Sequence, residues 1–168
     1  MLMVGSIFFD LAKAFDSVNH SLLINKLPCY GIMRKAKLLI ESYLADRFQR
    51  VQLDSTILKV KTSSAWYKVN QGVPQGSVLG PLLFLLYIND LPNALTHNAT
   101  PTLFADDTSI IISGQNVLRF QEELNATFGN ISNWFQTNSL SLNISKTHFM
   151  QFSSKNTNNK NNFLHIWN

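Results

Sequence analysis

Two adjacent carboxylates lie between apolar runs in the middle of this 168-residue chain. Asp106 and Asp107 follow Phe104-Ala105, and a run of isoleucines ending at Ile112 comes shortly after them. Burying a carboxylate costs free energy unless a partner compensates its charge, so an acidic pair at the tip of an apolar hairpin indicates a bound cation. The plain alternative is an ordinary turn, because Asp is common in turns for its backbone preferences alone.

A third carboxylate, Asp10, ends another short apolar run at residues 7–9. Three acids at the ends of buried strands are typical of a two-metal site that drives phosphoryl or nucleotidyl transfer. Magnesium prefers oxygen ligands in octahedral geometry, for which carboxylates are suited. The alternative for Asp10 is a helix cap or a turn.

The elements that must position these acids follow from hydrophobic periodicity. Asp16 or Ser17 is expected to cap the first helix. Hairpins among helices favour an α+β fold, with an antiparallel sheet and helices packed on one face. We expect strands at 6–10 and 147–152, a hairpin at 48–62 that turns at Asp54 and Ser55, and a second hairpin at 102–113. We also expect helices at 19–27, 33–46, 79–91 and 117–136, and a loop punctuated by Gly and Pro at 71–80.

The bulk properties narrow the class of protein. Hydrophobic residues make up 45% of the chain, and the net charge of +4 is compatible with a polyanionic partner without establishing one. The longest apolar stretch, residues 82–88, is far short of the ~18 residues that cross a membrane. The start of the chain lacks the basic segment of a signal peptide. A lone cysteine, Cys29, excludes an internal disulfide. We expect an intracellular protein of the cytoplasm or nucleus, neither secreted nor membrane-bound.

Four motifs in order give the chain a family resemblance. Residues 8–16 read FFDLAKAFD, residues 71–81 read QGVPQGSVLGP, residues 104–107 read FADD, and residues 142–147 read LNISKT. Together they resemble the reverse transcriptases of non-LTR (LINE-type) retrotransposons over residues ~6 to ~152. The Gly-Val-Pro-Gln-Gly-Ser run is long and specific. The resemblance implies an antiparallel polymerase-palm sheet with partial fingers.

The resemblance also implies roles for the acids. Asp10 and Asp106 would bridge two Mg²⁺ ions, with Mn²⁺ as the alternative, and Asp107 would assist. Lys146 would act as a general acid for the pyrophosphate leaving group, or as a point charge near it. The alternative for Lys146 is a solvated lysine after a turn.

Substrate contacts are implied for the first and second motifs. Phe15 would lie under the nucleotide sugar and exclude a ribose 2′-hydroxyl, which implies a preference for deoxynucleotides. Gln75 and Gly76 would border the nucleotide and the template, since glycine lets backbone approach a substrate closely. The alternatives are a core aromatic for Phe15 and, for the loop, an ordinary turn before a helix with Ser77 as its cap.

Two further acids and three further aromatic residues stand out in the sequence. Asp16 and Asp90 are expected to be structural, the first as a cap and the second at the end of the helix that starts at residue 79. Trp134 fits the apolar stripe of its helix and is expected to pack in the core. Base stacking is the alternative for Trp134 and is also open for Trp66, whose role, like that of its neighbour Tyr67, the sequence leaves undecided.

The expected organisation is a palm with partial fingers at residues 1–152, truncated at both ends. A flexible Asn-rich loop would follow at 153–162, and a truncated further segment would begin at 163–168. The expected activity is RNA-directed DNA polymerisation, with an RNA template, a DNA primer and deoxynucleoside triphosphates as partners. One alternative is an inactive retroelement remnant that at most binds nucleic acid. Another is a metal-binding domain that uses its carboxylates for stability only.

Overall fold

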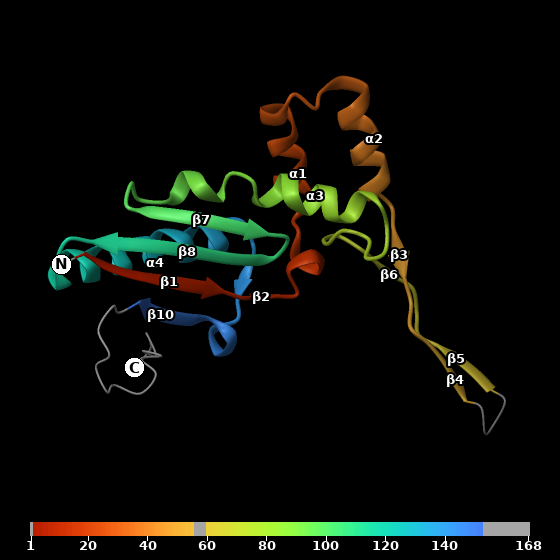
Figure 1. Ribbon diagram of the computed structural model, residues 1–168. Coiled ribbons are helices and arrows are strands. Elements are labelled where there is room, and N and C mark those ends of the chain that lie inside the picture. Colours follow the sequence, from red (N-terminus) through yellow and green to blue (C-terminus); the bar gives the residue numbers. More distant parts are fainter. Residues whose placement is uncertain (1, 56–59, 153–168) are drawn as a thin grey trace.

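A four-stranded antiparallel sheet forms the centre of the protein, in a computed structural model that describes residues 2–55 and 60–152. The sheet order is β10-β1-β8-β7, so the two middle strands come from distant parts of the chain (Figure 1). The predicted strand pairings of the acidic hairpin are confirmed. The four strands are β1 (Met3–Phe9), β7 (Ala99–Phe104), β8 (Asp107–Gly114) and β10 (His148–Phe152).

Alternating side chains give the sheet one covered face. Ile7 on β1 and Ile110 on β8 are fully buried, whereas Phe8 and Ile111 on the other face are exposed. Successive residues of a strand point to opposite faces, so this alternation separates a core face from an open face. The long helix α4 (Val117–Thr137) covers the core face and buries Phe120, Ile131 and Phe135 there. Helices packed on one face of an antiparallel sheet confirm the predicted α+β class.

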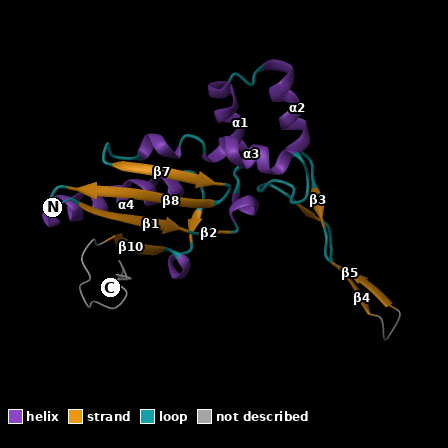
Figure 2. Cartoon of the chain, in the orientation of Figure 1, coloured by secondary structure: helices purple, strands orange, loops and turns teal. Residues whose placement is uncertain are grey.

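A second group of helices lies beside the sheet (Figure 2). The helix α1 (His20–Lys26) contacts both α2 (Arg34–Leu44) and α3 (Leu79–Ile88), and the packing buries Leu23 and Phe84. The predicted cap of α1 is wrong. Asn19 caps it, with Oδ1 accepting a hydrogen bond from the backbone N–H of Leu22 at 3.1 Å.

Short elements connect these parts. The strand β2 (Leu11–Ala12) follows the first sheet strand and pairs with β9 (Ser141–Leu142). The described residues also contain four 3₁₀ turns: η1 (Ala14–Ser17), η2 (Leu27–Tyr30), η3 (Leu91–Ala94) and η4 (Ile144–Lys146). The turn η1 occupies the residues that were expected to cap α1, which is why that helix starts later.

A two-stranded ribbon projects from the helical end of the molecule (Figure 1). It consists of β3 (Phe48–Gln49) paired with β6 (Tyr67–Lys68), and of β4 (Gln52–Ser55) paired with β5 (Val60–Ser63). We call these four strands the ribbon. The predicted hairpin at 48–62 is therefore present and extends further, to Lys68. Its predicted turn at Asp54 and Ser55 is wrong, because both residues pair across the ribbon, with Lys61 and Val60.

Three predictions lie wholly or partly outside the described residues. They are the Asn-rich loop at 153–162, the segment at 163–168 and the start of the second strand of the predicted hairpin, at residues 57–59. Within the described part of the chain, no helix is both long and apolar enough to cross a membrane.

Candidate active site

The strand register brings the acids of two motifs to one end of the sheet. Phe9, the last residue of β1, pairs with Thr108 on β8. Asp10 therefore continues from β1 at the same end at which Asp107 begins β8. Asp107 in turn pairs with Phe104 across the hairpin. The predicted proximity of the strand ends that carry Asp10 and Asp107 is thus present in the backbone.

Asp106 occupies the turn between β7 and β8. The turn contains two residues, and its first, Ala105, has a left-handed φ of +53°. A residue with a Cβ adopts this conformation at a cost of order 1 kcal/mol. Such local strain is found mostly where the surrounding structure enforces it, often at functional sites. The tight turn holds Asp106 directly beside Asp107.

The three carboxylates have no cationic partner within the described part of the chain. Asp10 and Asp106 are half-buried and Asp107 is exposed. The ion pairs found among the described residues all involve other acids: Asp46, Asp54, Asp90, Glu41 and Glu122. Carboxylates that approach one another repel, and a bound cation relieves that repulsion.

The donor set fits divalent metal ions in its chemistry. Carboxylate oxygens are the ligands that Mg²⁺ takes in proteins. In the described residues, however, no three His, Cys, Asp or Glu side chains already form a group that could hold a metal ion. The three acids therefore share one end of the sheet without forming a closed ligand set in this conformation.

The segment that carries Lys146 is attached to the backbone of Asp10. The carbonyl oxygen of Asp10 accepts a hydrogen bond from the N–H of Asn143 at 2.8 Å. The N–H of Asp10 donates to Oγ1 of Thr147 at 3.4 Å. Lys146 lies between these two anchors, with its side chain exposed. The fourth motif is thus fixed next to the first acid, although the two are far apart in sequence.

Phe15 lies at the junction between the first and second motifs. Its ring packs against that of Phe84 on α3, with 4.6 Å between the ring centroids. Its carbonyl oxygen accepts a hydrogen bond from the N–H of Val73 at 2.9 Å. The side chain is only partly buried. Phe15 is therefore anchored on one side and open on the other.

The loop that carries Gln75 is held against the turn η1. Nε2 of Gln75 donates a hydrogen bond to Oδ1 of Asp16 at 2.8 Å. Gly72 has a φ of +84°, and a Cβ there would lie 2.8 Å from the carbonyl oxygen of Asp16. Gly76 has a φ of +78° with open space around it. Glycine is needed at both positions for conformation, and at Gly72 also for the close approach of two backbones.

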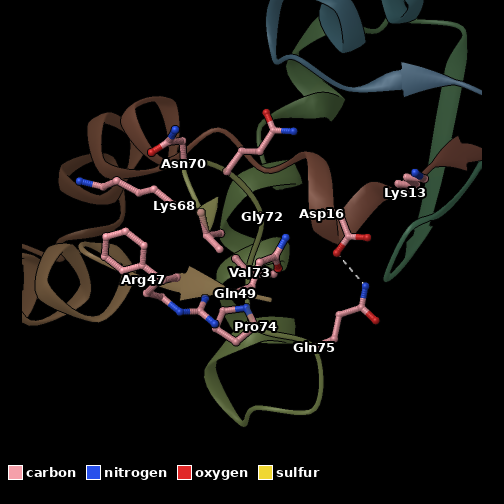
Figure 3. A pocket seen from close by; sticks show the side chains of 13 residues that line it. Lys13, Asp16, Arg47, Gln49, Lys68, Asn70, Gly72, Val73, Pro74 and Gln75 are labelled. Atoms are coloured by element: carbon pink, nitrogen blue, oxygen red, sulfur yellow. Dashed lines mark hydrogen bonds between the residues drawn. The ribbon is translucent and has the colours of Figure 1, made fainter. Parts of the chain in front are cut away.

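A polar cavity of about 550 Å³ opens beside this loop. Figure 3 shows Arg47 and Lys68 toward one end of it and the bonded pair Asp16 and Gln75 toward the other. Lys13 also lines the cavity. The three acids do not belong to the lining, and neither does Phe15. The structure thus brings Gln75 together with a cationic cavity, whose lining comes from segments that lie apart in the sequence.

Tyr87, on α3, links three elements behind the site. Its hydroxyl donates to the carbonyl oxygen of Asn138 after α4 and accepts from the N–H of Asn19 before α1 at 3.4 Å. The residue is fully buried. Burial raises the pKa of this phenol, the hydrogen bond from Asn19 lowers it, and the charge of Asp90 raises it further, so the pKa lies above its ordinary value.

The assignment of Asp16 to a helix cap is wrong, because its carboxylate binds the side chain of Gln75 instead. Asp90 is bonded to Lys26, whose Nζ lies 2.6 Å from Oδ1 of Asp90 and over the ring of Trp134. This arrangement agrees with the structural role expected for Asp90. No local sequence pattern predicts the hydrogen bond between Asp16 and Gln75, because it joins two segments that only the fold brings together.

Comparison with known proteins connects this geometry to a family. The profile described as reverse transcriptase (RNA-dependent DNA polymerase) matches residues 4–164. A probable RNA-directed DNA polymerase from transposon BS of Drosophila melanogaster is 33% identical over 157 residues. That match covers 85% of this chain and 16% of the relative. The RNA-directed DNA polymerase from mobile element jockey of the same fly is 27% identical, over 88% of this chain and 16% of that protein. The chain thus spans about a sixth of each.

Solved structures share the fold. The apo telomerase of Candida tropicalis, truncated from its C-terminal domain, superposes with a TM-score of 0.67 at 16% identity. The superposition covers 95% of this chain and 32% of the telomerase. The telomerase of the same yeast in complex with a fragment of telomeric RNA superposes with a TM-score of 0.65 at 14% identity, over 96% of this chain and 28% of that protein. Identity at this level supports a common fold.

Proposed function

The chain belongs to the reverse transcriptase (RNA-dependent DNA polymerase) family, and from this premise we propose that it catalyses nucleotidyl transfer. The substrates would be a DNA primer, an RNA template and deoxynucleoside triphosphates. The observation that carries the proposal is the register that brings the strand ends of Asp10 and Asp107 together, with Asp106 in the adjoining turn. Residues 1–152 would form the palm of the polymerase with part of its fingers.

Asp10, Asp106 and Asp107 would hold two Mg²⁺ ions, with Mn²⁺ as the alternative. When bound, the ions lower the pKa of the primer 3′-hydroxyl and neutralise charge on the pyrophosphate leaving group. The carboxylates are suited to this task because no cationic side chain pairs with them in the described residues, so no internal ion pair has to break. The hydrogen bonds of Asn143 and Thr147 to its backbone fix the position of Asp10.

The remaining residues would orient the substrates. Phe15 would support the sugar of the incoming nucleotide, with its ring held in place by Phe84. Gln75 and Gly76 would border the nucleotide and the template, where the open space at Gly76 leaves room for close approach. Lys146 would donate a proton to the pyrophosphate or place a positive charge near it.

Single-turnover primer extension tests this proposal. The 168-residue chain is used in excess over a DNA primer annealed to an RNA template, so that weak binding does not limit the rate. We expect incorporation that requires Mg²⁺ or Mn²⁺ and that falls roughly 100-fold or more in Asp106→Asn. The matched control is Glu122→Gln, an exposed carboxylate on α4 that pairs with Arg119, and it should incorporate like the wild type.

Two outcomes would overturn the proposal. Incorporation that persists in Asp106→Asn would show that the acid is not part of the reaction. A wild-type chain that binds primer and template but incorporates nothing would favour the alternative of a noncatalytic protein that binds nucleic acid.

A further inference from the structure

The ribbon is a surface without a core of its own. Every described side chain from Phe48 to Asp54 and from Lys61 to Lys68 is exposed. The side chains include large aromatic ones, with Phe48 56%, Trp66 60% and Tyr67 67% exposed. A lone two-stranded ribbon is marginally stable in water. Large exposed aromatic side chains on such an element are typical of a surface that binds a partner.

Aromatic and cationic side chains lie beside one another on the ribbon. Phe48 on β3 lies directly opposite Lys68 on β6. In the irregular segments that connect the two pairs of strands, the guanidinium of Arg50 lies over the ring of Trp66, 4.7 Å from its centroid. Each of these two contacts combines one ring with one positive charge, and the ammonium of Lys68 also pairs with the exposed carboxylate of Asp46 at 3.0 Å. We call these four residues the stacking face.

The charge of this region favours an anionic partner. Residues 46–70 contain five basic and two acidic residues. Aromatic rings and an arginine plane offer stacking surfaces to nucleic-acid bases, while the cations contact phosphates. A protein partner would not need this regular pairing of rings and positive charges, whereas a single strand of nucleic acid repeats a base and a phosphate at every step.

The stacking face continues into the polar cavity beside Gln75. Phe48 and Lys68 belong to the stacking face and also line the cavity, together with Arg47. At its other end the cavity is lined by Gln75, the residue proposed to border the nucleotide and template (Figure 3). A strand lying on the ribbon would therefore lead into the cavity and toward the second motif.

We infer that the stacking face binds single-stranded nucleic acid, the unpaired part of the template, and guides it into the cavity beside Gln75. The identification of the bound strand as the template rests on the proposed function. The binding itself depends on the ribbon and not on the acids, so the two can fail separately.

Fluorescence anisotropy with a labelled oligouridine of about 12 nucleotides measures this binding directly. We expect Phe48→Ala and Trp66→Ala each to weaken binding roughly 5- to 100-fold. Arg50→Gln and Lys68→Gln should each weaken binding and make it less sensitive to salt, because each removes one phosphate contact. Circular dichroism and thermal unfolding of each variant show whether the fold is retained.

Two matched controls lie away from the ribbon. Phe152→Ala removes an exposed aromatic side chain on β10, at the opposite end of β1 from Asp10. Arg119→Gln removes an exposed cation on α4. Both should bind the oligonucleotide like the wild type. Asp106→Asn should also bind it normally while losing nucleotide incorporation, which separates failure of the inference from failure of the proposed function.

The inference is overturned if the wild-type chain does not bind the oligonucleotide, or if the ribbon variants bind it as tightly as the controls do. Sedimentation velocity tests the alternative that the stacking face binds a second copy of the chain. A dimer in the wild type that becomes a monomer in Trp66→Ala, without any effect on oligonucleotide affinity, would assign the stacking face to a second copy of the chain and would also overturn the inference.

Discussion

The side-chain amide of Gln75 donates a hydrogen bond from Nε2 to Oδ1 of Asp16 at 2.8 Å, across 59 positions of sequence. A carboxylate only accepts hydrogen bonds, so the amide nitrogen must face Asp16. Oε1 of Gln75 is thereby left as an acceptor for another group. The contact fixes both the position of this side chain and the polarity that it offers to a substrate.

Asp16→Ala should raise the KM for the incoming nucleotide about fivefold, with a smaller effect on kcat. Loss of the hydrogen bond lets the Gln75 side chain rotate, and a net hydrogen bond is worth about 1 kcal/mol. Asp16→Asn should stay close to the wild type, because its amide oxygen can still accept from Gln75. Single-nucleotide kinetics at varied nucleotide concentration measure both constants. An unchanged KM in Asp16→Ala would contradict the positioning role.

The double variant Asp16→Asn/Gln75→Glu tests the polarity of the pair. Gln75→Glu alone places two carboxylates face to face and should impair nucleotide binding. Adding Asp16→Asn supplies a donor to the new carboxylate and leaves an oxygen free for the substrate, so nucleotide affinity should recover in part. Equal impairment of the single and double variants would show that the substrate needs the amide N–H of Gln75.

Phe15→Val should weaken the discrimination against ribonucleotides roughly 10- to 100-fold. The smaller side chain leaves room for a 2′-hydroxyl where the ring, anchored on Phe84, would exclude it. Phe15→Tyr keeps the ring and should keep the discrimination. The ratio of kcat/KM for ribo- and deoxynucleotides is the measurement, and an unchanged ratio in Phe15→Val would remove the steric role.

Tyr87→Phe should lower the free energy of unfolding by about 1–3 kcal/mol, because the carbonyl oxygen of Asn138 loses its buried donor. Chemical denaturation followed by circular dichroism measures this loss. Tyr67→Phe removes an exposed hydroxyl on the ribbon and should leave the free energy of unfolding unchanged. Equal stability of the Tyr87→Phe protein and the wild type would show that this hydrogen bond is not needed.

The raised pKa of Tyr87 predicts that the free energy of unfolding depends on pH. The pKa of Tyr87 is raised in the folded state, so the folded protein holds this proton more tightly than the unfolded chain does. Its contribution to stability is fully present below about pH 10 and is lost as the pH rises through the higher folded pKa. Denaturation at a series of alkaline pH values should show a steeper loss of stability in the wild type than in Tyr87→Phe.

Local pattern was sufficient for the individual strands of the sheet and for the acids at their ends. The apolar runs around Asp10 and Asp106 predicted strands that end in carboxylates, because alternation and chain length restrict where a buried strand can end. The cap of α1 could not be predicted in the same way. The turn η1 intervenes, and Asn19 rather than Asp16 or Ser17 meets the first free amides of the helix.

Contacts between distant segments could not be predicted from pattern. The alternation of residues 48–53 predicts a half-buried strand, yet Val51 and Leu53 are exposed, because no core lies against the ribbon. Periodicity describes two faces of a strand without saying what lies opposite either one. The contact between Asp16 and Gln75 depends in the same way on how the fold joins η1 to the second motif.

Iron-mediated backbone cleavage tests the central claim, that Asp10, Asp106 and Asp107 share a metal site, most directly. Fe²⁺ can occupy sites built for Mg²⁺ and, with ascorbate and peroxide, cuts the chain next to where it binds. We predict cuts close to Asp10 and to the turn at Ala105, detected by mass spectrometry. They should be suppressed by excess Mg²⁺, be absent in Asp106→Asn and be retained in Glu122→Gln. Cuts elsewhere in the chain, or cuts that persist in Asp106→Asn, would contradict the account.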